Sequence, residues 1–207
     1  MVPFANLILD HRQDSEATAA CDRPLRADAR RNRDRILCAA RELFASSGRD
    51  AQMEDIASAA GVGVGTVYRH FPTKAALLTA MVKARFAEMV EIAQKAEEAC
   101  PGDAALTTAI RWQTEAVHPD KGFQLAMMGW DALDWDEINP QLETLGAVMQ
   151  RLIARAAAAG QVRADLTFDD IGMLMCGVTS TMYFKPGHDW RRYLEIVING
   201  LRPAPAH

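Results

Sequence analysis

The chain has 207 residues, of which 49% are hydrophobic and 24% are charged, and its formal net charge is −4. This length suits two small domains or one large helical domain. No apolar run approaches the roughly 20 residues that a membrane-spanning helix needs, so the composition excludes an integral membrane protein and predicts a soluble chain.

Charge is distributed unevenly along the chain. Residues 22–85 hold 12 Lys or Arg against 7 Asp or Glu, whereas residues 86–207 hold 10 against 17, and the first 21 residues add a net charge of −2. A phosphate-binding domain joined to an acidic domain would show this pattern. The negative net charge of the whole chain therefore does not exclude nucleic-acid binding.

Residues 1–28 are expected to form a flexible N-terminal tail. Their short apolar run, residues 4–9, lacks the basic leading region and the cleavage site of a signal peptide, and the residues after it are polar and include Pro24. A basic approach to the first helix is formed by Arg23, Arg26, Arg30, Arg31, Arg33 and Arg35. It is either a solvated face or, beside a DNA-binding element, an arm that reaches the phosphate backbone or the minor groove.

The first helix is predicted over residues 30–47. Ile36, Ala40, Leu43 and Phe44 lie on one stripe, and Gly48 follows as the expected C-cap. Because a pair of short helices buries too little apolar surface to remain rigid, this helix is expected to cover the back of the next two.

A helix-turn-helix is predicted over residues 53–74. Met53, Ile56, Ala57 and Ala60 share one face of its first helix. Gly61 then reaches the left-handed backbone conformation that allows the chain to turn sharply. The alternative interpretation is an ordinary helical hairpin with polar surface residues.

The second helix of this motif is expected over residues 63–71, with Val67 and Phe71 directed inward. Its outward side chains can donate hydrogen bonds, and they are Thr66, Tyr68, Arg69 and His70. Gly63 and Gly65 each cost about 1 kcal/mol in a helix interior. At a helix N-terminus pressed against DNA they allow the backbone N–H groups to approach a phosphate oxygen.

The stretch AGVGVGTVYRHFPTKAALL resembles the DNA-binding signature of the TetR (tetracycline-repressor-like) family of bacterial transcription regulators. The resemblance covers residues 33–82, because the glycine turn, the threonine, the Tyr-x-His-Phe motif, the cap residue and the lysine all hold their spacing. Gln52 replaces the Thr or Ser that usually caps the first helix of the motif, so Asp50 is the expected cap instead.

The resemblance implies separate anchoring and reading residues. Tyr68, His70 and Lys74 would contact the DNA backbone, and bases would be read by Val64, Gly65, Thr66 and Arg69. The complete DNA-binding set is Arg33, Gly63, Val64, Gly65, Thr66, Tyr68, Arg69, His70 and Lys74. No nucleophile or carboxylate partner accompanies His70, so a catalytic role is not expected.

A long connecting helix is predicted after the motif. Thr73 is its expected N-cap, and an apolar stripe continues from residue 74 to residue 99 before Pro101 and Gly102 end it. At about 1.5 Å per residue this helix spans roughly 39 Å. It is either a lever between two domains or a structural spacer.

The remaining sequence predicts helices over residues 104–117, 121–133, 140–159, 167–184 and 189–201, with breaks at proline or glycine. No strand alternation or phosphate-binding loop is present. The predicted fold is all-α, with a helix-turn-helix domain over residues 29–75 and a ligand-binding and dimerisation domain over residues 76–207.

Methionine and aromatic residues in the middle helices usually indicate a core. The resemblance favours an effector site instead, because regulators of this family hold an inducer between these helices. The expected ligand-binding residues are Trp112, Phe123, Met127, Met128, Trp130, Met149, Met173 and Cys176. Trp135 lies among Asp131, Asp134, Asp136 and Glu137, which predict a solvated acidic loop or, alternatively, a site for a cationic ligand.

The last two helices carry clean apolar stripes, and residues 167–170 have the pattern of a capping box. The resemblance implies that this pair forms a four-helix bundle with a second copy. The expected interface residues are Ile171, Leu174, Met175, Val178, Met182, Trp190, Leu194, Val197, Ile198 and Leu201. The alternative is that both stripes close the core of a single copy.

The chemistry-bearing residues do not indicate an enzyme. Cys21, Cys38, Cys100 and Cys176 lie far apart, which fits a reducing cytoplasm and excludes a zinc site of the usual spacing. Buried structural cysteines are expected, with a redox-active thiol as the alternative. No paired acid and base, metal cluster or nucleophile motif is present, and no cofactor is expected.

These features predict a cytoplasmic, homodimeric, ligand-responsive regulator that binds a specific double-stranded DNA operator. A repressor released from a palindromic operator by an apolar or aromatic small molecule is the expected form. The alternatives are a constitutive DNA-binding protein without an inducer and a helical small-molecule-binding protein.

Overall fold

The computed structural model describes residues 13–100, 104–127, 133–185 and 187–203. Its described residues form nine α-helices, one 3-10 turn and no strand. The elements are α1 (Gln13–Ser47), η1 (Gly48–Asp50), α2 (Met53–Ala60), α3 (Val64–His70), α4 (Lys74–Ala99), α5 (Ala105–Val117), α6 (Lys121–Met127), α7 (Trp135–Ala158), α8 (Phe168–Phe184) and α9 (Trp190–Gly200). The predicted all-α fold is confirmed. Within the described ranges, no helix has the length and apolar character required to span a membrane.

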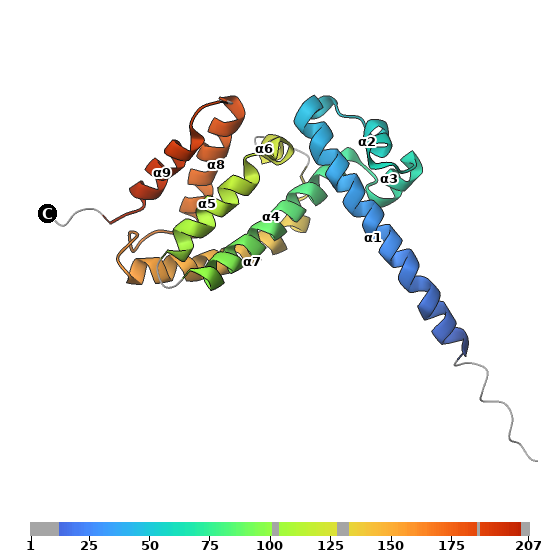
Figure 1. The fold of residues 1–207 in the computed structure, drawn as a ribbon, viewed down its shortest axis with the longest axis horizontal. Helices are drawn as coiled ribbons and strands as arrows, with labels where there is room; N and C mark the ends of the chain where they lie inside the picture. The colour runs from blue at the N-terminus through green and yellow to red at the C-terminus, as the bar shows by residue number, and fades with distance from the viewer. Residues whose placement is uncertain (1–12, 101–103, 128–132, 186, 204–207) are drawn as a thin grey trace, which may run out of the picture.

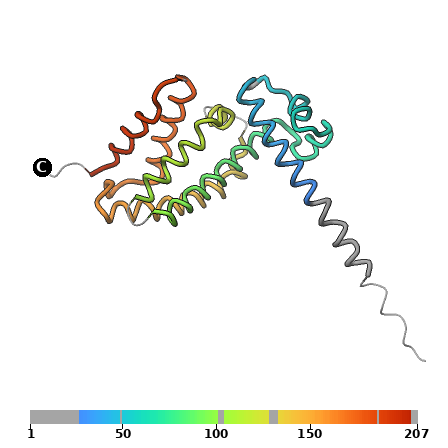
Figure 2. Tube along the Cα trace, in the orientation of Figure 1, coloured from blue at the N-terminus to red at the C-terminus, as the bar shows by residue number. Residues whose placement is uncertain are grey.

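Helix α4 connects two groups of helices (Figure 1). One group consists of α1, α2 and α3, where α4 follows α3 in the chain and packs on α1; along the rest of its length α4 packs against α5 and α7. Helices α8 and α9 lie on the far side of α5, and the short helix α6 lies between α1 and α8, in contact with both. The trace in Figure 2 shows α4 continuing from one group into the other without a break.

The helix-turn-helix forms as the sequence predicts. Gly61 ends α2 with φ +63°, in the left-handed region, and its N–H bonds back to the last turn of α2. Val67 and Phe71 are buried in the same apolar core as the α1 residues Ile36 and Phe44. The geometry of the turn and the inward stripe of α3 therefore fix which side of α3 faces solvent.

The predicted caps are confirmed at two later helices. The Thr73 hydroxyl accepts a hydrogen bond from the Ala76 N–H at 3.0 Å and starts α4. Thr167 and Asp170 form the complete capping box of α8, with the Asp170 carboxylate accepting from the Thr167 N–H at 2.9 Å. These hydrogen bonds, first from the Thr167 hydroxyl and then from its backbone N–H, lower the pKa of Asp170.

The expected cap of α2 is wrong. Asp50 lies in η1 and makes no cap, and Gln52, the residue before α2, makes no side-chain cap hydrogen bond either. The Gln52 side chain instead turns back and donates to the Asp50 carbonyl at 2.7 Å. Asp50 lies in the 3-10 turn, two residues before Gln52, which occupies the N-cap position of α2. From there it does not cap the first free N–H groups of α2.

Two helices begin earlier than predicted. Helix α1 starts at Gln13 rather than near Arg30, although Pro24 lies within its bounds. Helix α7 starts at Trp135 and contains Pro140, which was the expected break. The Asp134 carboxylate caps α7 by accepting from the N–H groups of Asp136 and Glu137.

The predicted acidic loop is therefore wrong for Asp134, Asp136 and Glu137. These carboxylates occupy the N-cap and first turn of α7, where the helix dipole stabilises negative charge. Asp131 lies outside the described residues, as do Met128 and Trp130.

Close packing of α6 on α1 depends on Gly122. A Cβ atom at this position would lie 3.3 Å from the Phe44 Cβ and 3.3 Å from the Met81 Cε. We expect Gly122→Leu to lower the free energy of unfolding by about 1–3 kcal/mol, because the side chain overpacks this contact. Urea denaturation measures the change.

Gly172→Ala is a control for the loss of a helical glycine without overpacking. Gly172 also lies in a helix, but a Cβ there would meet nothing within 4 Å. Alanine at this position should raise the free energy of unfolding by up to about 1 kcal/mol. A Gly122→Leu variant as stable as the wild type would contradict the packing argument.

Candidate DNA-contacting surface and internal cavity

Helix α3 presents most of the predicted DNA-binding residues to solvent. Gly63, Val64, Gly65, Tyr68 and Arg69 are exposed. Thr66, His70 and Lys74 are half-buried at the edges of the same surface, and Arg33 is half-buried on α1. All nine residues therefore keep some exposure to solvent, and seven of them lie in α3 or at its N-cap.

Contacts within the domain hold this surface in place. The Arg33 guanidinium lies 5.6 Å from the centre of the Phe71 ring, which joins α1 to the end of α3. The Lys74 ammonium lies 5.6 Å from the centre of the Phe44 ring. The Tyr68 hydroxyl donates a long hydrogen bond of 3.4 Å to the Glu54 carboxylate of α2. Arg33 and Lys74 are therefore held against aromatic rings of the domain core, and Tyr68 is held by a carboxylate of α2.

The glycines of α3 are not required by packing inside the chain. A Cβ on Gly65 would meet no atom within 4 Å, and one on Gly63 would meet only the Thr66 hydroxyl oxygen, at 3.9 Å. Neither residue has a positive φ. Glycine at position 65 costs helix stability without an intramolecular reason.

A cavity of about 530 Å³ lies in the second group of helices. Five of the predicted ligand-binding residues line it, namely Phe123, Met127, Met149, Met173 and Cys176. Trp112 is not part of the lining and is 43% exposed on α5, so the structure does not bring it together with the other five. Met173 is 75% exposed, so the cavity reaches the surface beside α8.

Other lining residues were not among the expected ligand-binding set, although Trp135 was considered for a cationic ligand. They include Phe86 and Met89 of α4, Gln113 and Thr114 of α5, Trp135, Leu142 and Leu145 of α7, and Phe168 and Met175 of α8. The apolar stripe of α4 contains Phe86, but a stripe reports only that a face is buried. The sequence pattern of such a stripe does not distinguish residues of a filled core from residues that line a cavity.

The described lining is apolar with few polar groups. It contains no Lys, Arg or His, and its one carboxylate is Asp169, an exposed residue of the first turn of α8. Both hydrogen bonds of Gln113 are donated by its Nε2, to the Met89 carbonyl at 3.0 Å and to the Met149 sulfur at 3.9 Å. The Gln113 Oε1 therefore remains as an acceptor.

The predicted dimer residues lie mostly inside the protomer. Seven are buried in its core: Ile171, Val178, Met182, Trp190, Leu194, Ile198 and Leu201. Leu174 is exposed, and Met175 and Val197 are half-buried. The alternative interpretation, that both stripes close the core of one copy, holds for these seven. The large apolar side chains exposed on α8 and α9 are Met173, Leu174, Phe184, Tyr193 and Ile196.

Ion pairs and a ring stack hold α9 against α5. Arg111 donates two hydrogen bonds to Glu195, at 2.7 and 2.9 Å, and Arg191 donates two to Glu115, both at 2.9 Å. The hydrogen bonds from Arg111 lower the pKa of Glu195. His118 stacks on Trp190 with ring centres 4.9 Å apart. These contacts fix α9 from outside while its apolar stripe fills the core.

The cysteines differ from the expected buried type. Cys38 and Cys176 are exposed, and Cys100 is half-buried. The apolar stripe of α1 leaves Cys38 on its solvent side, and Cys176 lies on the cavity-lining side of α8. No group of three or more potential metal ligands occurs among the residues whose positions are described.

Two family models match the chain. Residues 36–81 match the model of bacterial regulatory proteins of the tetR family, and residues 101–203 match the model of the C-terminal domain of SbtR-like transcriptional regulators. A curated relative is the HTH-type transcriptional regulator UidR of Escherichia coli (strain K12). It is 37% identical over 32% of this chain, and the match spans only 38% of its own length.

Solved structures extend the similarity over most of the chain. A TetR transcription regulatory protein from Mycobacterium vanbaalenii is 35% identical, with 87% of this chain and 100% of that chain covered and a TM-score of 0.63. A TetR regulator from Streptomyces coelicolor is 32% identical over 84% of this chain and 99% of that chain, with a TM-score of 0.61. FadR from Bacillus subtilis, in complex with stearoyl-CoA, shares the fold at 19% identity, with 83% and 98% covered and a TM-score of 0.67. This chain belongs to the TetR family of transcriptional regulators.

Proposed function

We propose that the protein is a homodimeric repressor that binds a palindromic DNA operator through α3 and leaves it when a small apolar molecule occupies the cavity. The observation that carries the DNA-binding part is Gly65, an exposed helical glycine with open space around it. The apolar cavity of about 530 Å³ supports the effector part.

Gly65 is explained by a partner outside the chain. A glycine in a helix is favoured where another backbone or a phosphate comes close, because a Cβ would hold the two apart. Gly63 precedes α3 as its N-cap residue, and Val64 and Gly65 form its first turn, where free N–H groups and the helix dipole attract a phosphate. A DNA duplex lying against the N-terminal end of α3 would explain why glycine occupies both positions.

The side chains around this turn divide into two roles. Tyr68, His70 and Lys74 lie toward the end of α3 and the start of α4, and we assign them to phosphate contacts. Arg69, Thr66 and Val64 are assigned to base reading, since an arginine can bind guanine through two hydrogen bonds and a methyl group can contact thymine.

Dimerisation follows from the way a helix-turn-helix reads DNA. Specific binding uses paired half-sites about 34–36 Å apart, which one copy cannot span with a single reading helix. The apolar side chains that α8 and α9 leave exposed, including the 59% exposed Ile196, give a second copy a surface to cover. We therefore propose that the dimer interface is formed by the exposed residues of α8 and α9 rather than by the buried stripes. These residues are Met173, Leu174, Phe184, Tyr193 and Ile196.

The effector is proposed to be uncharged and largely apolar. A carboxylate or phosphate in the cavity would meet no described cationic side chain and would lie near Asp169. Methionine side chains adapt their shape to an apolar guest, and the Gln113 Oε1 can accept one hydrogen bond from it. Solved relatives hold stearoyl-CoA in one case and resorcinol in another, so the fold accepts ligands of different size.

Selection of binding sequences from a random duplex library tests the main proposal. We expect enrichment of a palindrome, and we expect Gly65→Ala to bind the enriched duplex at least about tenfold more weakly while unfolding at a higher urea concentration. Stability and DNA affinity change in opposite directions, because alanine stabilises the helix but its Cβ prevents a DNA phosphate from coming close to the backbone.

Gly172→Ala is the control, since it should gain stability without losing DNA affinity. Equal affinity of Gly65→Ala and the wild type would refute close backbone approach at α3. A library that yields no enriched sequence would refute sequence-specific binding.

Salt titrations separate anchors from readers. Lys74→Ala should weaken binding to all duplexes and reduce the slope of log K against log salt by about 0.9, the value of one lost phosphate contact. Arg69→Ala should change the enriched sequence at one position of each half-site and cost about 1–3 kcal/mol there. Lys95→Ala, on the exposed side of α4, is the control, and an identical effect of Lys74→Ala and Lys95→Ala would contradict the assignment.

A matched ligand pair tests the proposed effector class. We expect a medium-chain fatty alcohol to raise the melting temperature and release the enriched duplex, and the fatty acid of the same length to do neither at pH 7, because its carboxylate finds no cation in the cavity. Fluorescence anisotropy of labelled duplex measures release. Stronger release by the acid would contradict an uncharged effector, and binding of the alcohol without release would favour a constitutive DNA-binding protein.

A further inference from the structure

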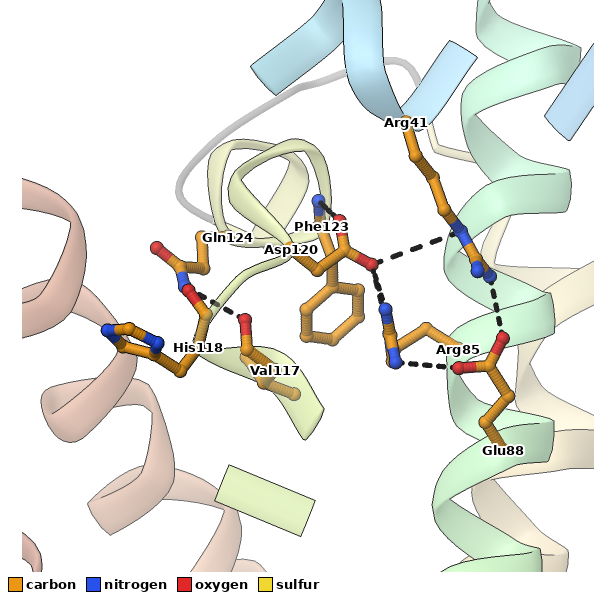
Figure 3. A network of polar contacts seen from close by, with 8 residues as sticks. All are labelled: Arg41, Arg85, Glu88, Val117, His118, Asp120, Phe123 and Gln124. Carbon is orange, nitrogen blue, oxygen red and sulfur yellow. Dashed lines mark hydrogen bonds and ion pairs between the residues drawn. The ribbon is translucent and has the colours of Figure 1, made fainter. Parts of the chain in front are cut away.

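A polar cluster lies where α6 meets α1 and α4 (Figure 3). It consists of Arg41 of α1, Arg85 and Glu88 of α4, and Asp120, the residue before α6. The Asp120 Oδ2 accepts hydrogen bonds from Arg85, at 3.0 Å from its Nε and also from its Nη2, and the two side chains are 5% and 10% exposed. Glu88 joins the two arginines, accepting from Arg85 at 2.6 Å and from Arg41 at 2.8 Å.

Asp120 is also bonded to α6. Its second oxygen, Oδ1, accepts the Phe123 N–H at 2.9 Å and so caps this helix. The buried Gln124 side chain donates to the carbonyls of Val117 and His118, both at 2.9 Å, and ties α6 to the end of α5. The turn between the two helices is therefore braced, and Asp120 moves with α6.

The seven residues of α6 contact both the cavity and the DNA-binding domain. Phe123 and Met127 line the cavity, and the Phe123 ring meets the Phe86 ring edge to face at 5.7 Å. At Gly122 the backbone of α6 approaches α1, where an added Cβ would lie 3.5 Å from the Arg41 carbonyl oxygen. A guest that displaces Phe123 cannot leave the contact with α1 unchanged, because the helix between them is less than two turns long.

The Arg41 side chain is incompletely bonded in this arrangement. Its Nε is buried and has no hydrogen-bond acceptor. The same atom lies 3.9 Å from the Asp120 Oδ2, about 1 Å beyond hydrogen-bond distance. A buried donor without an acceptor raises the free energy of the folded protein. A small shift of α6 toward α1 would lower it, because the Arg41 Nε could then donate a hydrogen bond to Asp120.

We infer that Asp120 and Arg41 form a two-position joint that carries the state of the cavity to the DNA-binding domain. In one position, that of this structure, the Asp120 Oδ2 accepts hydrogen bonds from Arg85 and makes only a longer ion pair of 3.9 Å with the Arg41 Nε; in the other it also accepts a hydrogen bond from that Nε. Occupancy of the cavity changes the position of α6 through Phe123 and thereby selects one position. This inference rests on the proposed function, since it concerns how an effector changes operator affinity.

A cavity-filling substitution tests the joint without knowledge of the natural effector. Thr179→Phe places a ring in the cavity from α8, which packs on α6. The dissociation constant for the library-enriched duplex is measured in the wild type, in Thr179→Phe, in Arg41→Lys and in the double variant. Arg41→Lys keeps the positive charge beside Glu88 but removes the Nε that faces Asp120.

We expect Thr179→Phe to change the dissociation constant about tenfold in the wild-type background and less than about threefold in the Arg41→Lys background, since the coupling passes through the missing atom. Asp120→Asn provides a second background with the same expectation, and thermal unfolding verifies that each variant is folded. A brace with no role in coupling would give the same factor in every background, and that result would overturn the inference.

Glu97→Gln is the matched control background. Glu97 is another carboxylate of α4 that binds two arginines, Arg151 and Arg155, but on the side facing α7. The full effect of Thr179→Phe should persist there, and its loss would overturn the inference by showing that any broken ion pair abolishes coupling. An equal effect of Thr179→Phe in all backgrounds leaves the proposed function intact. No effect in the wild type overturns both ligand response and the joint.

Discussion

The structure depends on one uninterrupted helix that is shared by both groups of helices and runs through their common apolar core. Near its start α4 packs with α1, where the Lys74 ammonium lies over the Phe44 ring. Further along, Phe86 forms part of the cavity wall, and the helix continues between α5 and α7. Its 26 residues contain no glycine or proline, so it has no built-in position at which to bend. Any rearrangement of the cavity wall must therefore be absorbed at the packing contacts of α4 or transmitted along it.

Helix α6 offers a second route between the same two regions, and the two routes differ physically. Apart from Arg85 and Glu88, the contacts of α4 are extensive and mostly apolar. They resist small displacements of the helix, because a close-packed core has few alternative arrangements. The contacts around Asp120 are ionic, directional and shared between competing donors. Such a group of charges can exchange partners over short distances. The apolar helix supplies stiffness, and the polar cluster supplies a choice between discrete states.

Local signals explain which parts of this fold were predictable from sequence. Gly61, Thr73 and the capping box at Thr167 act on the few residues next to them, so their positions in the sequence determine the local backbone. The predicted start of α7 was wrong because Pro140 removes only one helical hydrogen bond. The cap at Asp134 and tertiary packing outweigh the loss of that bond. The stripes of α8 and α9 identified a buried face correctly. An apolar stripe contains no information about whether its partner is the same chain or another copy, and a void likewise leaves no mark on helical periodicity.

Helix α8 places the cavity mouth on the same surface as the proposed contact between copies. Met173 lines the cavity and is also 75% exposed, next to the exposed Leu174. If a second copy covers this side chain, guest exchange and subunit association become linked equilibria, and each must alter the other by the same factor. The apparent affinity for a guest would then vary with protein concentration. Titrations at nanomolar and micromolar protein would report different values for one and the same cavity.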